Sequence, residues 1–252
     1  MTAAAASCAD RFAMTRFARG SLGLAGGLML AALFIATGNA SAEEHLPRTA
    51  KVQSERYGAG NARSFDFYVL SLSWSPSYCA AEGNDANEQQ CSGGRPYAFV
   101  THGLWPQFER GYPEYCGIAE RDVPRDRANA LLDIMPSRGL IRYQWRKHGS
   151  CSGLGQGAYF ADVRAAWNKV AIPQQFVRPS GFATVKPEAV EAAFLEANAG
   201  LPRDGIAVTC DRRYLREVRI CMTRDFQFRS CPEVDAAACR ASQVVMPPVR
   251  SR

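Results

Sequence analysis

The chain has 252 residues, of which 47% are hydrophobic and 21% charged, and its formal net charge is +6. This length allows one domain with a sizeable core, and only one run of residues, near the N-terminus, is apolar enough to resemble a membrane segment. The mild positive charge is compatible with a polyanionic substrate, but the sequence contains no polybasic tail, internal repeat or glycine-rich phosphate-binding loop.

The first 42 residues resemble a secretory signal peptide. Three arginines precede an apolar run at residues 22–36, and the small-residue sequence Ala40-Ser41-Ala42 follows. An uncleaved membrane anchor is the alternative, but the apolar run is short and a cleavage site comes directly after it. We therefore predict removal of residues 1–42, export to a periplasm or the medium, and no membrane association of the remaining chain.

Residues 43–63 are polar and contain glycine, which predicts a flexible N-terminal arm before a single domain at residues 64–240. In residues 65–74, apolar side chains alternate onto both faces, as expected of a strand in the middle of a sheet. Residues 80–95 are polar and glycine-rich and predict a loop, and a second short strand is predicted at residues 97–101.

Helical spacing of apolar residues and segments rich in β-formers follow in turn. The predicted helices are 126–135, 138–149, 159–170 and 187–198, and the predicted strands are 206–210, 214–221 and 226–231. Two prolines and the closing Arg-Ser-Arg predict a disordered tail at residues 241–252. This order predicts an α+β fold, in which helices flank a central and largely antiparallel sheet.

Cysteine usage points to an oxidising compartment. Cys8 leaves with the signal peptide, and an even number remains: Cys79, Cys91, Cys116, Cys151, Cys210, Cys221, Cys231 and Cys239. We expect these to form four disulfides that staple the single domain. No Cys-x-x-Cys spacing occurs, so no metal site is predicted. A catalytic Cys151 beside His148 is an open alternative, although it would leave another cysteine unpaired.

The chain has three histidines, and two of them lie in unusual peptides. His102 lies in the sequence FVTHGLWP at residues 99–106, and His148 lies in WRKHGSC at residues 145–151. His45 lies in a polar stretch near the predicted cleavage point and has no such neighbours. Tryptophan and glycine beside both of the other histidines indicate a site. If His102 and His148 meet in space, they can act as the acid and the base of a proton-transfer reaction.

In a helix at residues 138–149, Gln144, Lys147 and His148 share overlapping parts of one face, and Tyr143 flanks it. A lysine and hydrogen-bond donors suit an oxyanion whose charge grows in the transition state. Two imidazoles and an ammonium group without metal ligands suit phosphoryl transfer within RNA. One histidine would take the proton of the 2′-hydroxyl, and the other would protonate the leaving 5′-oxygen, with no cofactor.

The peptides at residues 101–106 and 145–151 resemble the two active-site segments of the ribonuclease T2 family. The resemblance extends to LSWSPSYC at residues 72–79, to Arg219-Ile220-Cys221 and to Cys231-Pro232, and so covers roughly residues 64–240. It implies a monomeric, acid-preferring and metal-independent endoribonuclease. Such an enzyme cleaves single-stranded RNA with low base specificity through a 2′,3′-cyclic phosphate.

By this resemblance His102 and His148 match the catalytic pair, with His148 as base and His102 as acid. Lys147 matches the lysine that steadies the charged phosphate, and Trp105 matches an aromatic residue of a base site, where stacking tolerates any base. We also expect Tyr143 and Gln107 to contact the substrate. The family pairing of cysteines would be Cys79–Cys91, Cys116–Cys151, Cys210–Cys239 and Cys221–Cys231.

The second segment departs from the family pattern at two positions. Gln144 stands where relatives have a glutamate, so it cannot take up a proton, but it can donate an N–H to a phosphoryl oxygen. Tyr143 replaces an accessory histidine. Outside this segment, in the first predicted strand, Ser73 stands where many relatives have a glutamine at a base pocket. Two alternatives therefore remain: a weakened homologue that acts as an RNA-binding or toxin-like protein, and an unrelated secreted binding domain.

Overall fold

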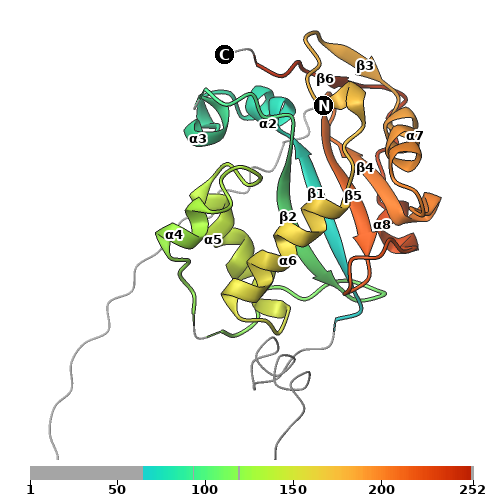
Figure 1. The fold of residues 1–252 in the computed structure, drawn as a ribbon. Helices are drawn as coiled ribbons and strands as arrows, with labels where there is room; N and C mark the ends of the chain where they lie inside the picture. Colours follow the sequence, from blue (N-terminus) through green and yellow to red (C-terminus); the bar gives the residue numbers. More distant parts are fainter. Residues whose placement is uncertain (1–64, 93, 119, 251–252) are drawn as a thin grey trace, which may run out of the picture. The chain divides into compact units, whose positions relative to one another are not determined.

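The structure is a computed structural model that describes residues 65–92, 94–118 and 120–250 (Figure 1). The predicted signal peptide (1–42) and arm (43–63) lie outside these residues. The elements in chain order are β1 (Phe67–Trp74), α2 (Ser75–Glu82), η1 (Gly83–Asp85), α3 (Glu88–Cys91), β2 (Phe99–Gln107), α4 (Arg125–Asn129), α5 (Arg138–Lys147), η2 (Gly149–Cys151), α6 (Gln156–Lys169), η3 (Gln174–Phe176), β3 (Ala183–Val185), α7 (Pro187–Ala197), η4 (Arg203–Gly205), β4 (Ile206–Cys210), β5 (Leu215–Met222), α8 (Pro232–Ala236) and β6 (Val244–Met246).

The long strands form one antiparallel sheet in the order β2-β1-β5-β4. β1 is an interior strand of this sheet, as the apolar residues on both of its faces predicted. The short strands β3 and β6 form a separate antiparallel pair. The predicted α+β class and the largely antiparallel sheet are thus confirmed.

One face of the sheet carries the main hydrophobic core. From β1 it receives the buried side chains Tyr68, Leu70, Leu72 and Trp74. Helix α6 crosses this face in Figure 1, and the Tyr159 hydroxyl donates a hydrogen bond to the Leu104 carbonyl at 2.8 Å. Each large apolar side chain buried here contributes about 1.5–3 kcal/mol, so this face anchors the domain.

The opposite face of the sheet has only a small apolar cluster. Its members are Phe67, Val69, Cys221 and Cys231, with Trp105 and Val234 packed against them. Val218 and Ile220 of β5 are buried in the main core. Because side chains alternate along a strand, the residues next to them in β5 point to the opposite face. Glu217 and Arg219 therefore lie on the face that has room for polar groups.

Helices replace the loop that was predicted at residues 80–95. The chain runs from α2 through η1 into α3, and the prediction was wrong there. Pro76 occupies the first turn of α2, where its missing N–H costs nothing. The Asn87 side chain accepts a hydrogen bond from the Gln90 amide and so caps α3.

Other element boundaries also differ from the predictions. The second strand continues from residue 101 to Gln107, and α4 ends at Asn129, well before residue 135. The predicted strand at residues 226–231 is reduced to an isolated antiparallel bridge between Phe228 and Met222, and Phe226, with a positive φ of 61°, lies at the turn before it.

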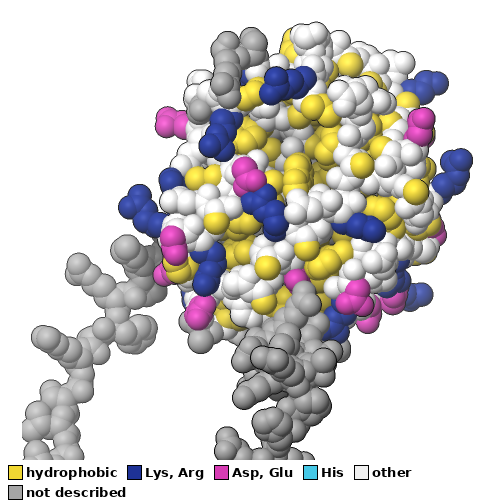
Figure 2. Space-filling model, in the orientation of Figure 1, with side chains coloured by type: hydrophobic (Ala, Val, Ile, Leu, Met, Phe, Trp, Pro, Cys, Tyr) yellow, Lys and Arg dark blue, Asp and Glu magenta, His cyan; other side chains and the backbone are white. Residues whose placement is uncertain are grey.

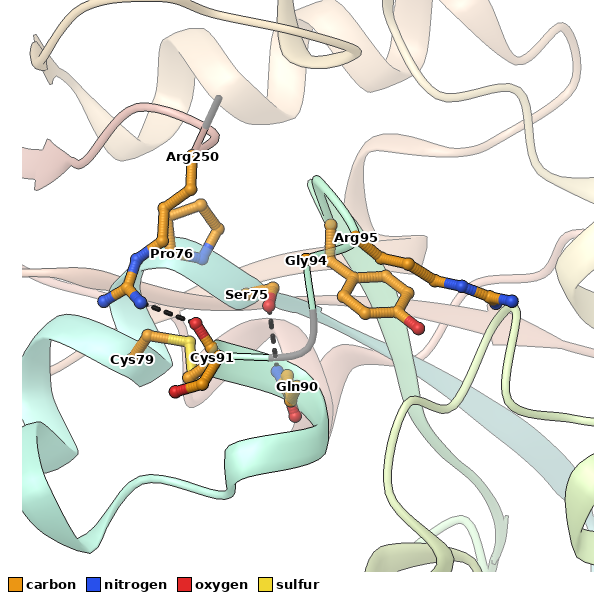
Figure 3. Close-up of a pocket in the computed structure, with 10 residues that line it drawn as sticks. Ser75, Pro76, Cys79, Gln90, Cys91, Gly94, Arg95 and Arg250 are labelled. Carbon is orange, nitrogen blue, oxygen red and sulfur yellow. Dashed lines mark hydrogen bonds between the residues drawn. A yellow bond between two sulfur atoms is a disulfide. The ribbon is translucent and has the colours of Figure 1, made fainter. Parts of the chain in front are cut away.

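The C-terminal segment was wrongly predicted to be a disordered tail. Residues 244–246 form β6, and the Trp74 indole N–H donates a hydrogen bond to the Pro247 carbonyl at 3.0 Å. Arg250 reaches α3 and donates to the Cys91 carbonyl at 2.5 Å, on the wall of a cavity shown in Figure 3. These long-range contacts could not be predicted from the two prolines and the closing Arg-Ser-Arg of this segment.

Four disulfides connect the elements: Cys79–Cys91, Cys116–Cys151, Cys210–Cys239 and Cys221–Cys231. They are the pairs that the family resemblance implied. Cys151 is bonded to Cys116, so the alternative of a catalytic Cys151 thiolate is wrong.

The surface in Figure 2 mixes Lys and Arg side chains with acidic and hydrophobic ones, and no single basic patch covers this view. Among residues 65–250, excluding 93 and 119, no helix has the length and hydrophobicity that a membrane crossing requires.

Candidate active site

A pocket of about 290 Å³ opens on the face of the sheet that carries Glu217 and Arg219, between the sheet and the end of α5. It is lined by Val69, His102, Trp105, Gln107, Tyr112, Tyr143, Gln144, Lys147, His148, Glu217, Arg219 and Val234. All seven residues that the sequence put forward for catalysis or substrate contact line this one pocket, including Gln107 and Tyr143.

His102 occupies a bulge in β2. Ser71 of β1 pairs with Gly103 and Leu72 pairs with Thr101, so His102 is the extra residue between them. Bulges re-aim a side chain and often lie next to active sites. The bulge also resets the alternation of the strand, so that His102 and Trp105, three residues apart, share the face that carries Glu217. The sequence placed His102 at the end of a strand, whereas it lies within one.

His148 follows the last residue of α5, and its backbone amide still donates to the Gln144 carbonyl at 2.9 Å. The residue is 6% exposed, and its Nδ1 has no hydrogen-bond partner among the described protein groups. The Trp105 ring lies between the two histidines, with centroid distances of 5.5 Å to His102 and 5.2 Å to His148. Both imidazoles therefore border the same space.

The surroundings of His148 keep its imidazole neutral. Burial, followed by the positive charges of Lys147 and His102, lowers the pKa of His148 from 6.5 to about 3. A buried imidazole favours its uncharged form because water no longer solvates the cation. At any pH well above 3, His148 can accept a proton.

Glu217 is a pocket residue that the sequence reasoning missed. One of its carboxylate oxygens is hydrogen-bonded to His102 Nδ1, and the other accepts from Arg219 Nε at 3.0 Å and Nη2 at 2.8 Å. Burial alone would raise the pKa of Glu217, but the hydrogen bond and charge of His102, with the charge of Arg219, lower it to about 2. The signal available in the sequence was the spacing of Glu217 and Arg219, which lie two residues apart on a predicted strand and so share one face.

Gln144 is buried and links the helix to the sheet. Its side-chain oxygen accepts a hydrogen bond from the Trp105 indole N–H at 2.8 Å, which identifies the other atom as the amide nitrogen. That nitrogen, Nε2, has no partner among the described protein groups. A Cβ on Gly103 would lie 2.2 Å from the Gln144 oxygen, so only glycine allows this contact.

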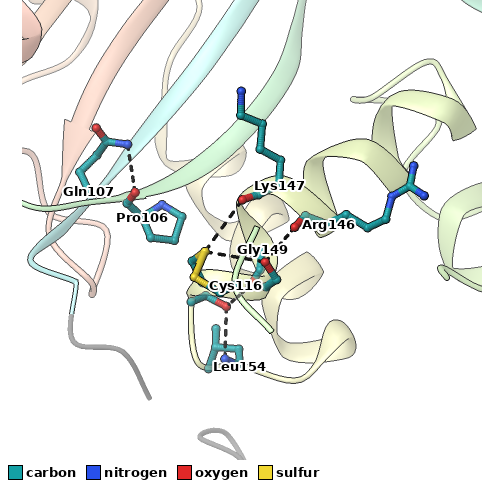
Figure 4. Close-up of a disulfide and its surroundings, with 10 residues drawn as sticks. Pro106, Gln107, Cys116, Arg146, Lys147, Gly149 and Leu154 are labelled. Carbon is teal, nitrogen blue, oxygen red and sulfur yellow. Dashed lines mark hydrogen bonds between the residues drawn. A yellow bond between two sulfur atoms is a disulfide. The ribbon is translucent and has the colours of Figure 1, made fainter. Parts of the chain in front are cut away.

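Lys147 lies between aromatic rings at the mouth of the pocket. Its ammonium is 5.9 Å from the Tyr115 ring centroid, 5.8 Å from that of Tyr143 and 3.4 Å from a Glu114 carboxylate oxygen. Burial lowers the pKa of Lys147, but Tyr143 and Glu114 outweigh it and raise that pKa, so the side chain stays charged. In Figure 4 it extends away from the disulfide, and Arg146 leaves the helix in another direction.

The Cys116–Cys151 disulfide ties the loop after β2 to η2, directly beyond His148 (Figure 4). The Tyr115 amide donates to the Lys147 carbonyl at 2.8 Å, which fastens the same loop to the end of α5. The Tyr112 and Tyr115 side chains of this loop are more than half exposed beside the pocket, and sequence reasoning did not single them out. In the described part of the chain, no three His, Cys, Asp or Glu side chains gather as a possible metal site.

The family model of the ribonuclease T2 family matches residues 65–231, which include both histidine segments and Glu217. The chain belongs to the ribonuclease T2 family. This membership removes the alternative of an unrelated binding domain, and it supports endonucleolytic cleavage of RNA as the activity of the chain.

Relatives in this family include a ribonuclease of Aeromonas hydrophila, 35% identical over 181 residues that cover 66% of this chain and 75% of that protein. Ribonuclease I of Escherichia coli is 26% identical over 218 residues, covering 69% of this chain and 79% of that protein. The fold resembles that of RNase NT, solved in complex with 5′-AMP, with a TM-score of 0.61 and 22% identity over 74% of this chain and all of that one.

Proposed function

We propose that this T2 ribonuclease cleaves single-stranded RNA by transphosphorylation, with a 2′,3′-cyclic phosphate as the first product. The main observation that supports this proposal is the contrast between two imidazoles at one pocket. His148 is buried and neutral, whereas His102 is hydrogen-bonded to a carboxylate. Acid and base roles are separated when the environments of two titratable groups favour opposite protonation states.

His148 is the base in this proposal. A neutral imidazole nitrogen of His148 removes the proton of the 2′-hydroxyl, and the 2′-oxygen forms a bond to phosphorus. Its low pKa makes the proton acceptor available in acidic solution, where an ordinary histidine is already protonated.

Lys147 and Gln144 stabilise the phosphorane-like centre. Negative charge grows on the non-bridging oxygens as the 2′-oxygen attacks, and a fixed ammonium and amide N–H favour that state without reorganisation. The unpartnered Nε2 of Gln144 supports this role, because a buried donor without a partner is unfavourable until a ligand oxygen meets it.

His102 is the acid. As the bond between phosphorus and the 5′-oxygen breaks, the imidazolium of His102 gives its proton to that oxygen, and the cyclic phosphate remains. Trp105, adjacent to both imidazoles, offers a flat apolar ring on which a base can stack. Stacking of this kind tolerates every base, which supports low specificity. The 5′-AMP bound to RNase NT is a nucleotide of matching chemistry.

A weakened, RNA-binding homologue is the second candidate, and Gln144 is the residue that favours it. The retained His102, His148 and Lys147, gathered at one pocket, favour the active enzyme instead. We further propose that the chain is exported and acts as a monomer. The four disulfides support export, because such bonds persist in oxidising compartments.

The test is digestion of single-stranded RNA in the presence of a chelator, with mass spectrometry of the products. We expect fragments that end in 2′,3′-cyclic phosphate, and a fall in rate of about 10²–10⁴-fold for His102→Ala and for His148→Ala. Cleavage that stops with chelator, or products without the cyclic phosphate, would contradict the proposal. RNA binding without cleavage at any pH would support the second candidate.

A further inference from the structure

The pocket contains a carboxylate, but it comes from the sheet and not from the helix of His148. At the helix position next to Trp145 the side chain is the amide of Gln144, which is not ionisable. Among the residues that line the pocket, Glu217 on β5 supplies the carboxylate. The groups that surround Glu217 on the sheet therefore determine its role.

Strand pairing places Glu217 beside His102. Ser73 of β1 pairs with Glu217 on one side and with Val100 of β2 on the other. His102 lies two residues after Val100 on β2 and so on the same face of the sheet, and its imidazole forms a hydrogen bond with the carboxylate across β1. The bulge adds one residue to β2, which brings Trp105 to this face as well.

Both oxygens of Glu217 are occupied. Oε1 is bonded to Nδ1 of His102, and Oε2 accepts two N–H groups of the Arg219 guanidinium. The Arg219 guanidinium also lies 5.2 Å from the Trp105 ring centroid. The carboxylate is thus fixed in position, and Arg219 connects it to the indole that borders both imidazoles.

An ionised carboxylate at Nδ1 decides which nitrogen can move a proton. A carboxylate only accepts, so Nδ1 must carry a hydrogen and Nε2 is the nitrogen that exchanges its proton with a substrate. The negative charge of the carboxylate also attracts the positive charge of an imidazolium at this position. The side chain of Glu217 is only 10% exposed, so water screens this attraction weakly.

We propose that Glu217, held by Arg219, is the positioning residue of the acid: it orients His102 and stabilises the imidazolium that delivers a proton from Nε2 to the leaving 5′-oxygen. This inference rests on the proposed function. Glu217 touches no reacting atom, and its whole effect on the reaction passes through His102. It therefore serves leaving-group protonation alone and not the attack of the 2′-oxygen.

The test compares two substrates with Glu217→Gln. One is a dinucleoside monophosphate that the wild type cleaves, whose 5′-oxygen leaves only with a proton. The other is the matching nucleoside 3′-(4-nitrophenyl phosphate), whose leaving group departs without one. We expect kcat for the dinucleotide to fall about 10–100-fold, as for other partners of a functional histidine, and kcat for the nitrophenyl ester to stay near the wild-type value.

Glu191→Gln is the matched control. Glu191 is another partly buried glutamate, and it accepts a hydrogen bond from the Val208 amide of β4 at 2.8 Å, away from the pocket. We expect this variant to cleave both substrates as the wild type does. In a His102→Ala background, Glu217→Gln should cause no further loss on either substrate, because the group through which it acts is gone.

Two results would overturn the role of Glu217 alone: an equal fall of kcat on both substrates, or wild-type rates on both. A further loss in the His102→Ala background would do the same, since Glu217 would then act by another route. If His102→Ala lowers kcat equally on both substrates, His102 is not the acid and the proposed mechanism fails first, together with this inference.

Discussion

The sheet side and the helix side of the pocket, here called its two halves, each hold one histidine, but they surround it with different groups. The sheet half holds His102 at a bulge, with its side chain 33% exposed and a buried carboxylate as partner. The helix half holds His148 with 6% exposure, beside the Lys147 ammonium, and this environment favours the neutral ring.

In the proposed mechanism, one residue type performs two roles within one pocket because its two copies have different neighbours. Desolvation and the like charge of Lys147 act against protonation of His148, whereas His102 is hydrogen-bonded to the carboxylate of Glu217. If the two halves differ as proposed, changes in each should alter different steps of the reaction.

The sharpest contrast is expected between the two histidine variants on the two substrates. His148→Ala should slow cleavage of both the dinucleotide and the nitrophenyl ester by about 10²–10⁴-fold, because every reaction needs the base. His102→Ala should lose as much only on the dinucleotide. Steady-state rates on both substrates check this, and identical patterns for the two variants would remove the distinction between the halves.

Lys147→Met should lower kcat by about 10²–10³-fold, the usual loss when one donor to a developing oxyanion is removed. Arg146→Met is the control, because Arg146 is the exposed neighbour on the same helix and does not line the pocket. We expect that variant to retain the wild-type kcat. Equal losses in both variants would indicate a general effect of charge on RNA binding.

Loss of the Cys116–Cys151 disulfide, directly beyond His148, should affect the helix half of the pocket only. The double substitution Cys116→Ser and Cys151→Ser opens a loop with a sequence separation of 35 residues. It should lower the free energy of unfolding by about 3–4 kcal/mol. Serine at both Cys79 and Cys91, separated by 12 residues, should cost somewhat less. Denaturant unfolding measures both, and only the first change is expected to lower activity at a temperature where both variants are folded.

The pH profile of kcat/KM should report the buried histidine. Because the pKa of His148 is lowered to about 3, the base stays unprotonated in mild acid, and activity should fall only as the pH approaches that value. In Lys147→Met the opposing charge is gone, so protonation becomes easier and the acid limb should move to higher pH. An acid limb near pH 6.5 in the wild type, the ordinary histidine value, would contradict the proposed state of His148.

Gln144→Glu should have the smallest effect, and we expect it on the pH profile. The new carboxylate would still accept from the Trp105 indole, but its charge near His148 would favour the imidazolium and move the acid limb to higher pH. Gln144→Leu, which removes both the acceptor and the donor, is the control for loss of the hydrogen bond. An unchanged rate and pH profile in Gln144→Glu would show that the amide is not responsible for any departure from the family.

Short-range patterns predicted much of this fold. Apolar residues on both faces of residues 65–74 indicated an interior strand, and helical spacing located α5, α6 and α7 to within a few residues. The predictions were wrong at residues 80–95, where the signal was a polar and glycine-rich composition, and at residues 241–252, where it was two prolines and the closing Arg-Ser-Arg. Long-range contacts decide those segments, such as the hydrogen bond between Trp74 and the Pro247 carbonyl.

The sequence by itself determined the family, the two histidine peptides and the side of α5 that faces the pocket, because each of these depends on residues close together in the chain. Only the tertiary structure decided that His102 meets Glu217. That contact depends on strand order and register across β1, and no local pattern encodes which strand lies next to which.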